Sequence, residues 1–221
     1  MDITLKQIKK DHRINSFVDQ TERYMMAMGY TDHGRRHMDI VSDRSKMLAR
    51  KVGLSAHEQE TSAIAGWCHD IGNFLGRTQH HYWGAMLFSQ CYIDENNPED
   101  VSQIIQAIVS HDKDDLKIVD KVTACVIIAD KSDVHRGRVQ NKNIKSIKDD
   151  IHDRVNYAVT DNKLTVDKQK KAITLSLKLD TKFTDIMDYF SIFTERMGYC
   201  QKAAKYLKYK FHLNINGTKI S

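Results

Sequence analysis

The chain has 221 residues, enough for one well-packed domain with a small appendage, since single domains typically span about 100–200 residues. Hydrophobic residues make up 41% and charged residues 29% of the sequence, which excludes a chain that is disordered throughout. The formal net charge of +5 is concentrated from Lys145 onward, where 15 Lys and Arg face 9 Asp and Glu. This surplus allows contact with phosphates or nucleic acid, and a solvated basic face is its simpler interpretation.

The N-terminal segment alternates charged residues with isolated apolar ones and lacks the continuous apolar stretch of a signal peptide. The longest apolar run, 124–129, is far shorter than the roughly 18 residues that cross a membrane. We therefore expect a cytoplasmic protein with no membrane partner. No cysteines form a CxxC pair, which favours buried free thiols over a zinc knuckle or a disulfide framework. The cysteines are Cys68, Cys91, Cys125 and Cys200.

Apolar residues recur at helical spacing over residues 4–28, and Gly29 ends this predicted helix. A second helix is expected over about 31–51, with His37 in its first half and Gly53 as its stop.

Ser55 and Glu58 form a capping-box pattern that opens a third helix, which breaks at Gly72. His69 and Asp70 fall in its last turn. Three more helices are expected: one over about 79–96, one that starts at Asn97 and Pro98 and runs to His111, and one over 120–134. The last is strongly apolar, so we expect it to be central to the core.

The pattern changes from about residue 145. A helix over about 147–157 is followed by KLTV and AITLSLKL, whose alternating hydrophobicity predicts strands. A helix over about 183–208 comes next, and KFHLNI before Asn216 and Gly217 predicts a final strand or hairpin. The sequence thus predicts a mainly α fold, with an all-helical domain over residues 1–144 and a small basic α+β extension over 145–221.

Several histidines and carboxylates stand at the ends of the predicted helices, and imidazole with carboxylate suits iron, manganese, zinc or a similar divalent ion. With 11 histidines in the chain, any single one is more often a surface residue or a hydrogen-bonded core group. The prediction of a metal site therefore depends on the ordered set. This set is His37, His69, Asp70, His80, His111 and Asp130.

The order of these residues resembles the HD superfamily of metal-dependent phosphohydrolases, whose pattern is an early histidine, a His-Asp pair and a later aspartate. His37 stands in HMDIV, His69 and Asp70 stand in WCHDIGN, and Asp130 stands in IIADKSD. The resemblance covers about residues 31–138. It implies an HD-domain helical bundle in which these four side chains meet, and hydrolysis of a phosphoester or phosphoanhydride by attack of a metal-activated hydroxide.

Two further histidines resemble elements of the HD proteins that hold two metals. His80 stands in HHYWGAML and His111 stands in AIVSHD. With Asp70 bridging, they would bind a second ion, which gives one or two divalent ions (Fe, Mn, Zn or Mg) per chain. A one-metal site stays open, with His80 and His111 as polar residues at helix ends.

Four cations are candidates for phosphate binding: Arg77, Lys131, Arg136 and Arg138. Lys131 follows Asp130, and a cation there could neutralise charge on phosphoryl oxygens in the transition state. Asp133 is expected to orient a ligand histidine or a substrate hydroxyl. Asp70, Lys131 and Asp133 therefore form the predicted catalytic set. Exposed charges at the rim of the site are the ordinary alternative for the cations.

The sequence also departs from the family pattern. Asn73 follows HDIG, where many members have Lys or Arg. The absence of GYP disfavours a cyclic di-nucleotide phosphodiesterase, and the absence of HDxxED disfavours an alarmone hydrolase. The expected substrate is a nucleotide or a similar small phosphorylated metabolite. HxxxGAxL followed by AIxxH and IIAD also resembles bacterial HD proteins that cleave dinucleoside polyphosphates, which makes these our specific candidate.

The alternative function is a nucleotide-sensing or RNA-binding module built on an HD core. Near the C-terminus, four aromatic residues interleave with four lysines, which could support base stacking. These are Tyr199, Tyr206, Tyr209 and Phe211 with Lys202, Lys205, Lys208 and Lys210. An amphipathic helix packed on the core explains the stripe more simply, so we do not expect a nucleic-acid partner. A homodimer stays open.

Overall fold

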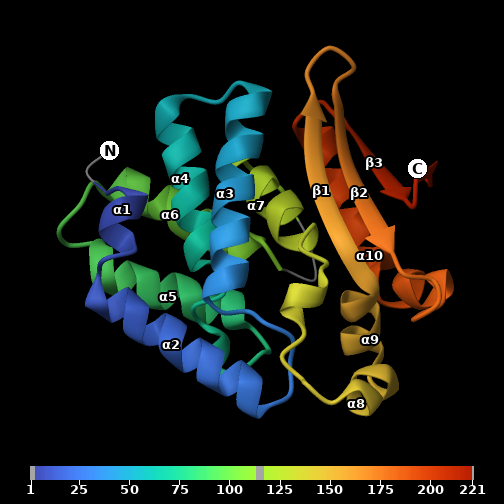
Figure 1. Cartoon of the computed structure of the whole chain (residues 1–221). Coiled ribbons are helices and arrows are strands. Elements are labelled where there is room, and N and C mark those ends of the chain that lie inside the picture. Colours follow the sequence, from blue (N-terminus) through green and yellow to red (C-terminus); the bar gives the residue numbers. More distant parts are fainter. Residues whose placement is uncertain (1–2, 113–116, 221) are drawn as a thin grey trace.

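The computed structural model describes residues 3–112 and 117–220, and it is mainly helical with a small sheet in its C-terminal part (Figure 1). The N-terminal helices are α1 (Leu5–Ile8), α2 (His12–Ala27), α3 (Arg35–Val52), α4 (Ala56–Cys68), α5 (His80–Tyr92), α6 (Pro98–Ser110) and α7 (Lys121–Lys131). The C-terminal elements are α8 (Ile144–Asp149), α9 (Ile151–Ala158), β1 (Val159–Asp167), β2 (Ala172–Leu179), α10 (Ile186–Tyr206), β3 (Lys210–Ile215) and β4 (Thr218–Lys219). The predicted mainly α class with a small α+β part is confirmed.

The sheet has the strand order β1-β2-β3-β4, and α10 connects the parallel strands β2 and β3. β1 pairs with β2, and β3 with β4, in antiparallel fashion. The predicted hairpin at Asn216 and Gly217 is confirmed, because both residues have the positive φ angles of a tight turn. Register places Leu175 opposite Leu213, so the buried side chains of β2 and β3 align on one face. In Figure 1, α10 runs across this small sheet.

Local capping explains several helix boundaries. The predicted capping box of Ser55 and Glu58 is present at the start of α4, and Asn97 caps α6 with Pro98 in its first turn. The single helix predicted over 4–28 is wrong, because the Asp11 carboxylate caps a new helix after α1 ends. Likewise Asp150 ends α8 and caps α9, which divides the predicted 147–157 helix.

Two hydrophobic clusters form the core, and α7 belongs to both. Val126 of α7 packs with the N-terminal helices in one cluster. Ile127 of α7 packs in the other with Leu48 of α3 and with Leu175 and Phe193 of the C-terminal part. Burial on all sides explains why the sequence of α7 is apolar all round, and it confirms the central place predicted for this helix. The second cluster crosses residue 144, so the two predicted domains share a core.

Hydrogen bonds also join the sheet to the segment after α7. Asn162 of β1 donates to the carbonyl oxygens of Ser132 (2.7 Å) and Val134 (2.8 Å). Arg44 of α3 donates to the Ser132 carbonyl (2.8 Å) and to the Asn162 side-chain oxygen (2.8 Å). The chain that follows Asp130 is therefore held by both α3 and the sheet.

The C-terminal aromatic stripe is not one amphipathic helix as predicted, because α10 ends at the exposed Tyr206 and Phe211 lies in β3, but two of its four rings do pack in the core. Tyr209 and Phe211 are buried in the core, and the Tyr206 hydroxyl donates to the Val119 carbonyl. Buried rings cannot stack on bases. All four cysteines are buried free thiols, as predicted. Within residues 3–112 and 117–220, none of the helices is both long and apolar enough to cross a membrane.

Candidate metal centre

The helix ends bring the six predicted metal ligands together. His37 lies in the first turn of α3, and His69 and Asp70 end α4. His80 begins α5, His111 follows α6, and Asp130 lies in the last turn of α7. The four histidines and Asp70 are buried. The ends of five helices, α3 to α7, thus converge on one interior point.

Gly72 allows this approach, and Gly84 lies opposite it. Gly72, in the HDIG motif, lies against the first turn of α5, and a Cβ there would collide with the backbone of His80 and Gly84. Gly84 in turn lies close to the backbone of His69 and Gly72. Since only glycine lacks the Cβ atom, the two motifs HDIG and HHYWGAML are packed backbone against backbone.

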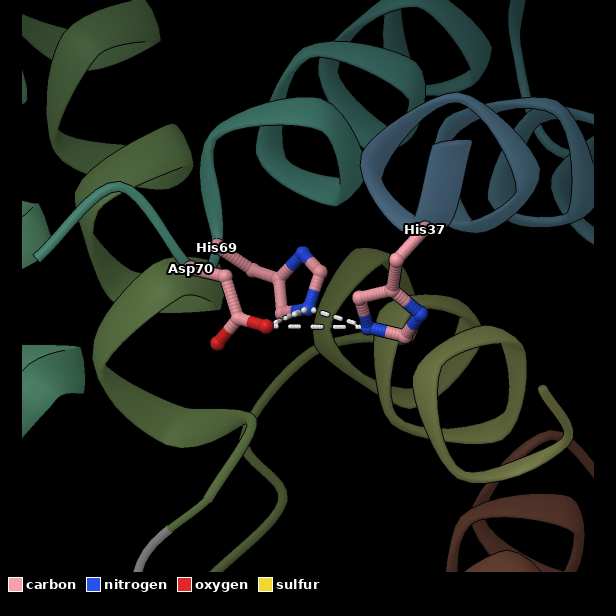
Figure 2. A group of neighbouring side chains, drawn as sticks. All are labelled: His37, His69 and Asp70. Carbon is pink, nitrogen blue, oxygen red and sulfur yellow. Dashed lines mark hydrogen bonds and ion pairs between the residues drawn. The ribbon is translucent and has the colours of Figure 1, made fainter. Parts of the chain in front are cut away.

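His37, His69 and Asp70 form the first set of donor atoms, and Asp130 joins this set beside the two histidines. His37 Nε2 lies 3.2 Å from His69 Nε2, 3.3 Å from Asp130 Oδ1 and 3.6 Å from Asp70 Oδ2. His69 Nε2 lies 3.3 Å from Asp70 Oδ2 and 3.7 Å from Asp130 Oδ1. Figure 2 shows His37, His69 and Asp70 pointing at one another from the ends of α3 and α4. Ligands about 2.1 Å from one ion are themselves roughly 3.0–3.4 Å apart, so these spacings suit a single divalent ion.

A second set uses the other oxygen of Asp70. Asp70 Oδ1 lies 3.2 Å from His80 Nε2 and 3.8 Å from His111 Nε2. The two imidazole nitrogens are 3.1 Å apart. Asp70 therefore offers one carboxylate oxygen to each set, which is the arrangement of a carboxylate that bridges two ions.

Hydrogen bonds at Nδ1 settle which nitrogen each ring presents to the centre. His69, His80 and His111 donate to backbone carbonyls of Gly66 (2.8 Å), Arg77 (2.9 Å) and Ile108 (2.6 Å), and His37 donates to Asp133 Oδ2 (2.8 Å). A carbonyl oxygen only accepts, so Nδ1 carries the proton and Nε2 of the neutral ring holds a lone pair. Two such lone pairs about 3 Å apart repel unless a cation lies between them. The donor set therefore fits bound metal.

The pKa values of the buried carboxylates and histidines also suit a bound cation. Burial opposes ionisation of Asp70, but the neighbouring charge of His69 holds the pKa of its carboxyl well below the usual range. Burial also opposes protonation of His69, yet the Asp70 and Asp130 carboxylates raise its pKa to about 10. Burial and the neighbouring imidazoles keep the pKa of His111 well below its ordinary value. A metal-free centre therefore holds its proton on His69, where the first ion would bind.

This raised pKa predicts an alkaline loss of stability in the metal-free protein. Because the unfolded histidine has a pKa of about 6.5, the stability contributed by protonated His69 is full below that pH and is lost as pH rises toward about 10. Between about pH 7 and pH 8.5 we expect the free energy of unfolding to fall by roughly 1–2 kcal/mol. The window stops there because the buried thiols, whose pKa values are raised, add a similar loss above it.

Urea unfolding at several pH values measures this loss. Manganese-saturated protein is the control, because an ion in place of the proton removes the dependence on His69. If the free energy of unfolding falls equally with pH in the presence and absence of manganese, the proton is not held by His69.

Asp133 positions His37 rather than facing the donor atoms. Its carboxylate accepts from His37 Nδ1 and from Arg36 (3.1 Å), and it is buried. Burial opposes its ionisation, and the hydrogen bond from His37 and the charge of Arg138 keep its pKa far below the usual range. The carboxylate therefore stays charged and fixes the imidazole with Nε2 toward the centre.

Replacing Asp133 by asparagine is expected to weaken manganese binding by about 10–100-fold, because outer carboxylates of this kind raise ligand basicity and fix the ring. Calorimetric titration with manganese measures the affinity. Asp153→Asn is a matched control, since Asp153 is also buried but lies in α9 outside the donor sets. An unchanged affinity in Asp133→Asn would show that His37 needs no orienting partner.

The structure brings two of the four predicted phosphate-binding cations to the centre. Lys131 Nζ lies 3.0 Å from Asp112 and 3.1 Å from Asp130. Arg77 lies 3.7 Å from Asp70 Oδ1 and donates to the Asn73 side-chain oxygen (2.9 Å). Both are within reach of an anion bound at the donor sets.

The other two cations have structural partners. Buried Arg138 donates to the backbone carbonyls of Asp32 and Asp133, which holds the segment before α3 against the segment after α7. Arg136 is exposed, lies over the Tyr157 ring at 5.1 Å and donates to the Tyr157 carbonyl. Their hydrogen bonds explain these positions without a ligand.

Three further residues at the centre escaped the sequence analysis as site residues. Asn73 Nδ2 donates to Asp70 Oδ1 (2.8 Å), and the Asn73 side-chain oxygen accepts from Arg77, so Asn73 connects Arg77 to Asp70. Asp112 pairs with Lys131, and the His33 ring lies 5.6 Å from that of His37. The available signals were HDIGN, SHD and the four-residue spacing of His33 and His37.

A cleft of about 700 Å³ opens beside the second donor set. Its lining includes Arg77, His80 and Asp112 together with Tyr82 and Gln106. The volume lies within the range of roughly 300–1,000 Å³ typical of small-molecule sites. A small ligand in this cleft would lie next to the second set of metal ligands.

Comparison with known proteins adds one relative. No family model matches the chain. The chain is similar to "Uncharacterized protein MJ1020" of Methanocaldococcus jannaschii, with 25% identity over a match that covers 60% of each protein. The chain thus spans about 60% of the length of this curated relative, whose name assigns no activity.

Proposed function

We propose that this chain is a metal-dependent phosphohydrolase of the HD superfamily, which hydrolyses a phosphoester or phosphoanhydride of a nucleotide or similar small phosphorylated metabolite. One observation carries the proposal: the two oxygens of Asp70 lie against two neighbouring sets of donor atoms, one at His69 and one at His80. The first set is completed by His37, His69 and Asp130, and the second by His80 and His111.

Divalent ions held by these residues would supply Lewis acidity toward phosphoryl oxygens and activate water for attack on phosphorus. Imidazole and carboxylate donors favour iron, manganese or zinc. Magnesium is an alternative that prefers oxygen ligands. The protein's own contribution is to position the substrate and to stabilise developing charge, which accounts for most catalysis of phosphoryl transfer.

Lys131 and Arg77 are the residues that would stabilise this charge. Lys131 is only 4% exposed, and the neighbouring carboxylates of Asp130 and Asp112 keep it protonated although burial opposes this. A buried ammonium beside phosphoryl oxygens acts at short range with little screening by water. Arg77 lines the cleft, where its planar guanidinium suits a phosphate group.

The cleft supports a nucleotide as the substrate. Arg77 and the donor residue His80 line it, together with the half-exposed ring of Tyr82 and the amide of Gln106. Phosphates would lie against Arg77 and His80, and a base could stack on the ring and bind the amide. Dinucleoside polyphosphates are our specific candidate within this class.

Elemental analysis of freshly purified protein, together with a hydrolysis screen, tests the proposal. We expect close to two transition-metal ions per chain, hydrolysis of at least one nucleotide or dinucleotide, and loss of activity with a chelator. Manganese, iron and zinc should each be restored separately, because the tightest-binding metal is not always the working one. One ion per chain would favour a mononuclear enzyme, and no metal after reconstitution would refute the proposal.

A further inference from the structure

Arg196 is a cation of the C-terminal part that no role described so far explains. It lies on α10, which packs against α7, the helix that carries Asp130 and Lys131. Its side chain is half-buried. The guanidinium carbon of Arg196 lies 5.1 Å from the centre of the Phe193 ring.

The other cations around the centre all have polar partners. Lys131 pairs with Asp112 and Asp130, Arg77 binds Asn73, and Arg138 donates to backbone carbonyls. Among the residues that the structure describes, no carboxylate or carbonyl pairs with the guanidinium of Arg196. The five N–H groups of this half-buried guanidinium are therefore left to water, and an anion from outside the chain would accept charge-assisted hydrogen bonds from them.

Arg196 also faces the centre. Tyr199, one turn further along α10, lies with its ring 5.4 Å from Lys131 Nζ. Residues three apart share a helix face, so Arg196 lies on the side of α10 that faces Lys131. Burial lowers the pKa of Arg196, and Asp130 and Asp112 are among the charges that act on it, which agrees with this position. The guanidinium remains charged at neutral pH.

We infer that Arg196 binds a phosphoryl oxygen of the substrate, so that the C-terminal part contributes a substrate-binding residue to the metal centre. This inference rests on the proposed function. A phosphate supplies the missing acceptor and can take two parallel hydrogen bonds from a guanidinium. Arg77 would approach the ligand from the side of the second donor set, and Arg196 from the side of Asp130.

Anion binding to the full chain tests the inference without depending on turnover. The probe is methylenediphosphonate, a diphosphate analogue that cannot be hydrolysed, titrated calorimetrically into manganese-loaded protein. We expect Arg196→Gln to weaken its binding by about 10–100-fold, as loss of a charged hydrogen-bond donor does. Arg196→Lys should lose less affinity, since lysine keeps the positive charge but cannot donate two parallel hydrogen bonds to one phosphate. Lys205→Gln, an exposed change on the same helix, should bind like the wild type.

Manganese content and thermal unfolding of each variant show whether the centre and the fold are intact, and Arg196→Lys carries the test if Arg196→Gln does not fold. The inference is overturned if the Arg196 variants bind the diphosphonate as the wild type does, or if the wild type does not bind it. If binding depends on Arg196 but the wild type hydrolyses no phosphate ester, the anion site stands and the proposed function fails. If hydrolysis occurs and Arg196→Gln changes neither binding nor KM, only the present inference fails.

Discussion

Asp70→Asn is expected to lose both metal ions and to reduce hydrolysis at least about 1,000-fold, equivalent to roughly 4 kcal/mol of transition-state stabilisation. Asp70 supplies one oxygen to each donor set, so a neutral amide there weakens both sites at once. The amide has nearly the same shape as the carboxylate, and Asn73 beside it can still hydrogen-bond to its oxygen. The measurements are metal content after desalting and initial rates with the best substrate.

The control for this variant is Asp153→Asn, a change of the same chemistry at a buried carboxyl outside the site. Burial raises the pKa of Asp153, so this position already tolerates loss of charge. It should keep both ions and full activity. Two ions and normal rates in Asp70→Asn would mean that no carboxylate bridge exists, and the proposed mechanism would be wrong.

Variants of the two histidine pairs should separate the two sites. His80→Gln or His111→Gln is expected to leave about one ion per chain, because each removes a ligand of the second set only. Hydrolysis should fall by at least about 100-fold, since one of two charges that stabilise the transition state is lost. His37→Gln should remove the other ion, and calorimetric titration with manganese resolves the two stoichiometries.

His152→Gln is the control, because His152 is exposed on α9 and outside both sets. If His80→Gln retains two ions and wild-type rates, the second set is not a metal site. His80 and His111 would then be the polar helix-end residues of the one-metal alternative.

Much of the fold was predictable because its signals are local. The capping box at Ser55, the stop at Gly53 and the Asn216-Gly217 turn each depend on a few neighbouring residues, and all are present. The break at Asp11 was missed because apolar spacing continues across it, while the cap that restarts the helix is a single side chain. Helical spacing alone does not reveal such interruptions.

The site was predictable where a motif specifies it, and unpredictable where packing does. The ligand histidines and aspartates follow an ordered pattern, and the structure gathers all of them. The different positions of Lys131 and Arg136, five residues apart, depend on which groups fold beside them. Arg196 lies far along the chain from the motifs, and only the packing of α10 on α7 places it near Asp130.

The shared core limits how this protein can have evolved and how it can be trimmed. Asn162 of β1 holds the segment that follows Asp130, and the C-terminal part covers apolar side chains of α3 and α7. A chain cut after residue 144 would expose that surface to water, which favours aggregation over a smaller folded protein. The C-terminal part is thus not a removable module, and shuffling it between proteins would require matching replacements on both of these helices.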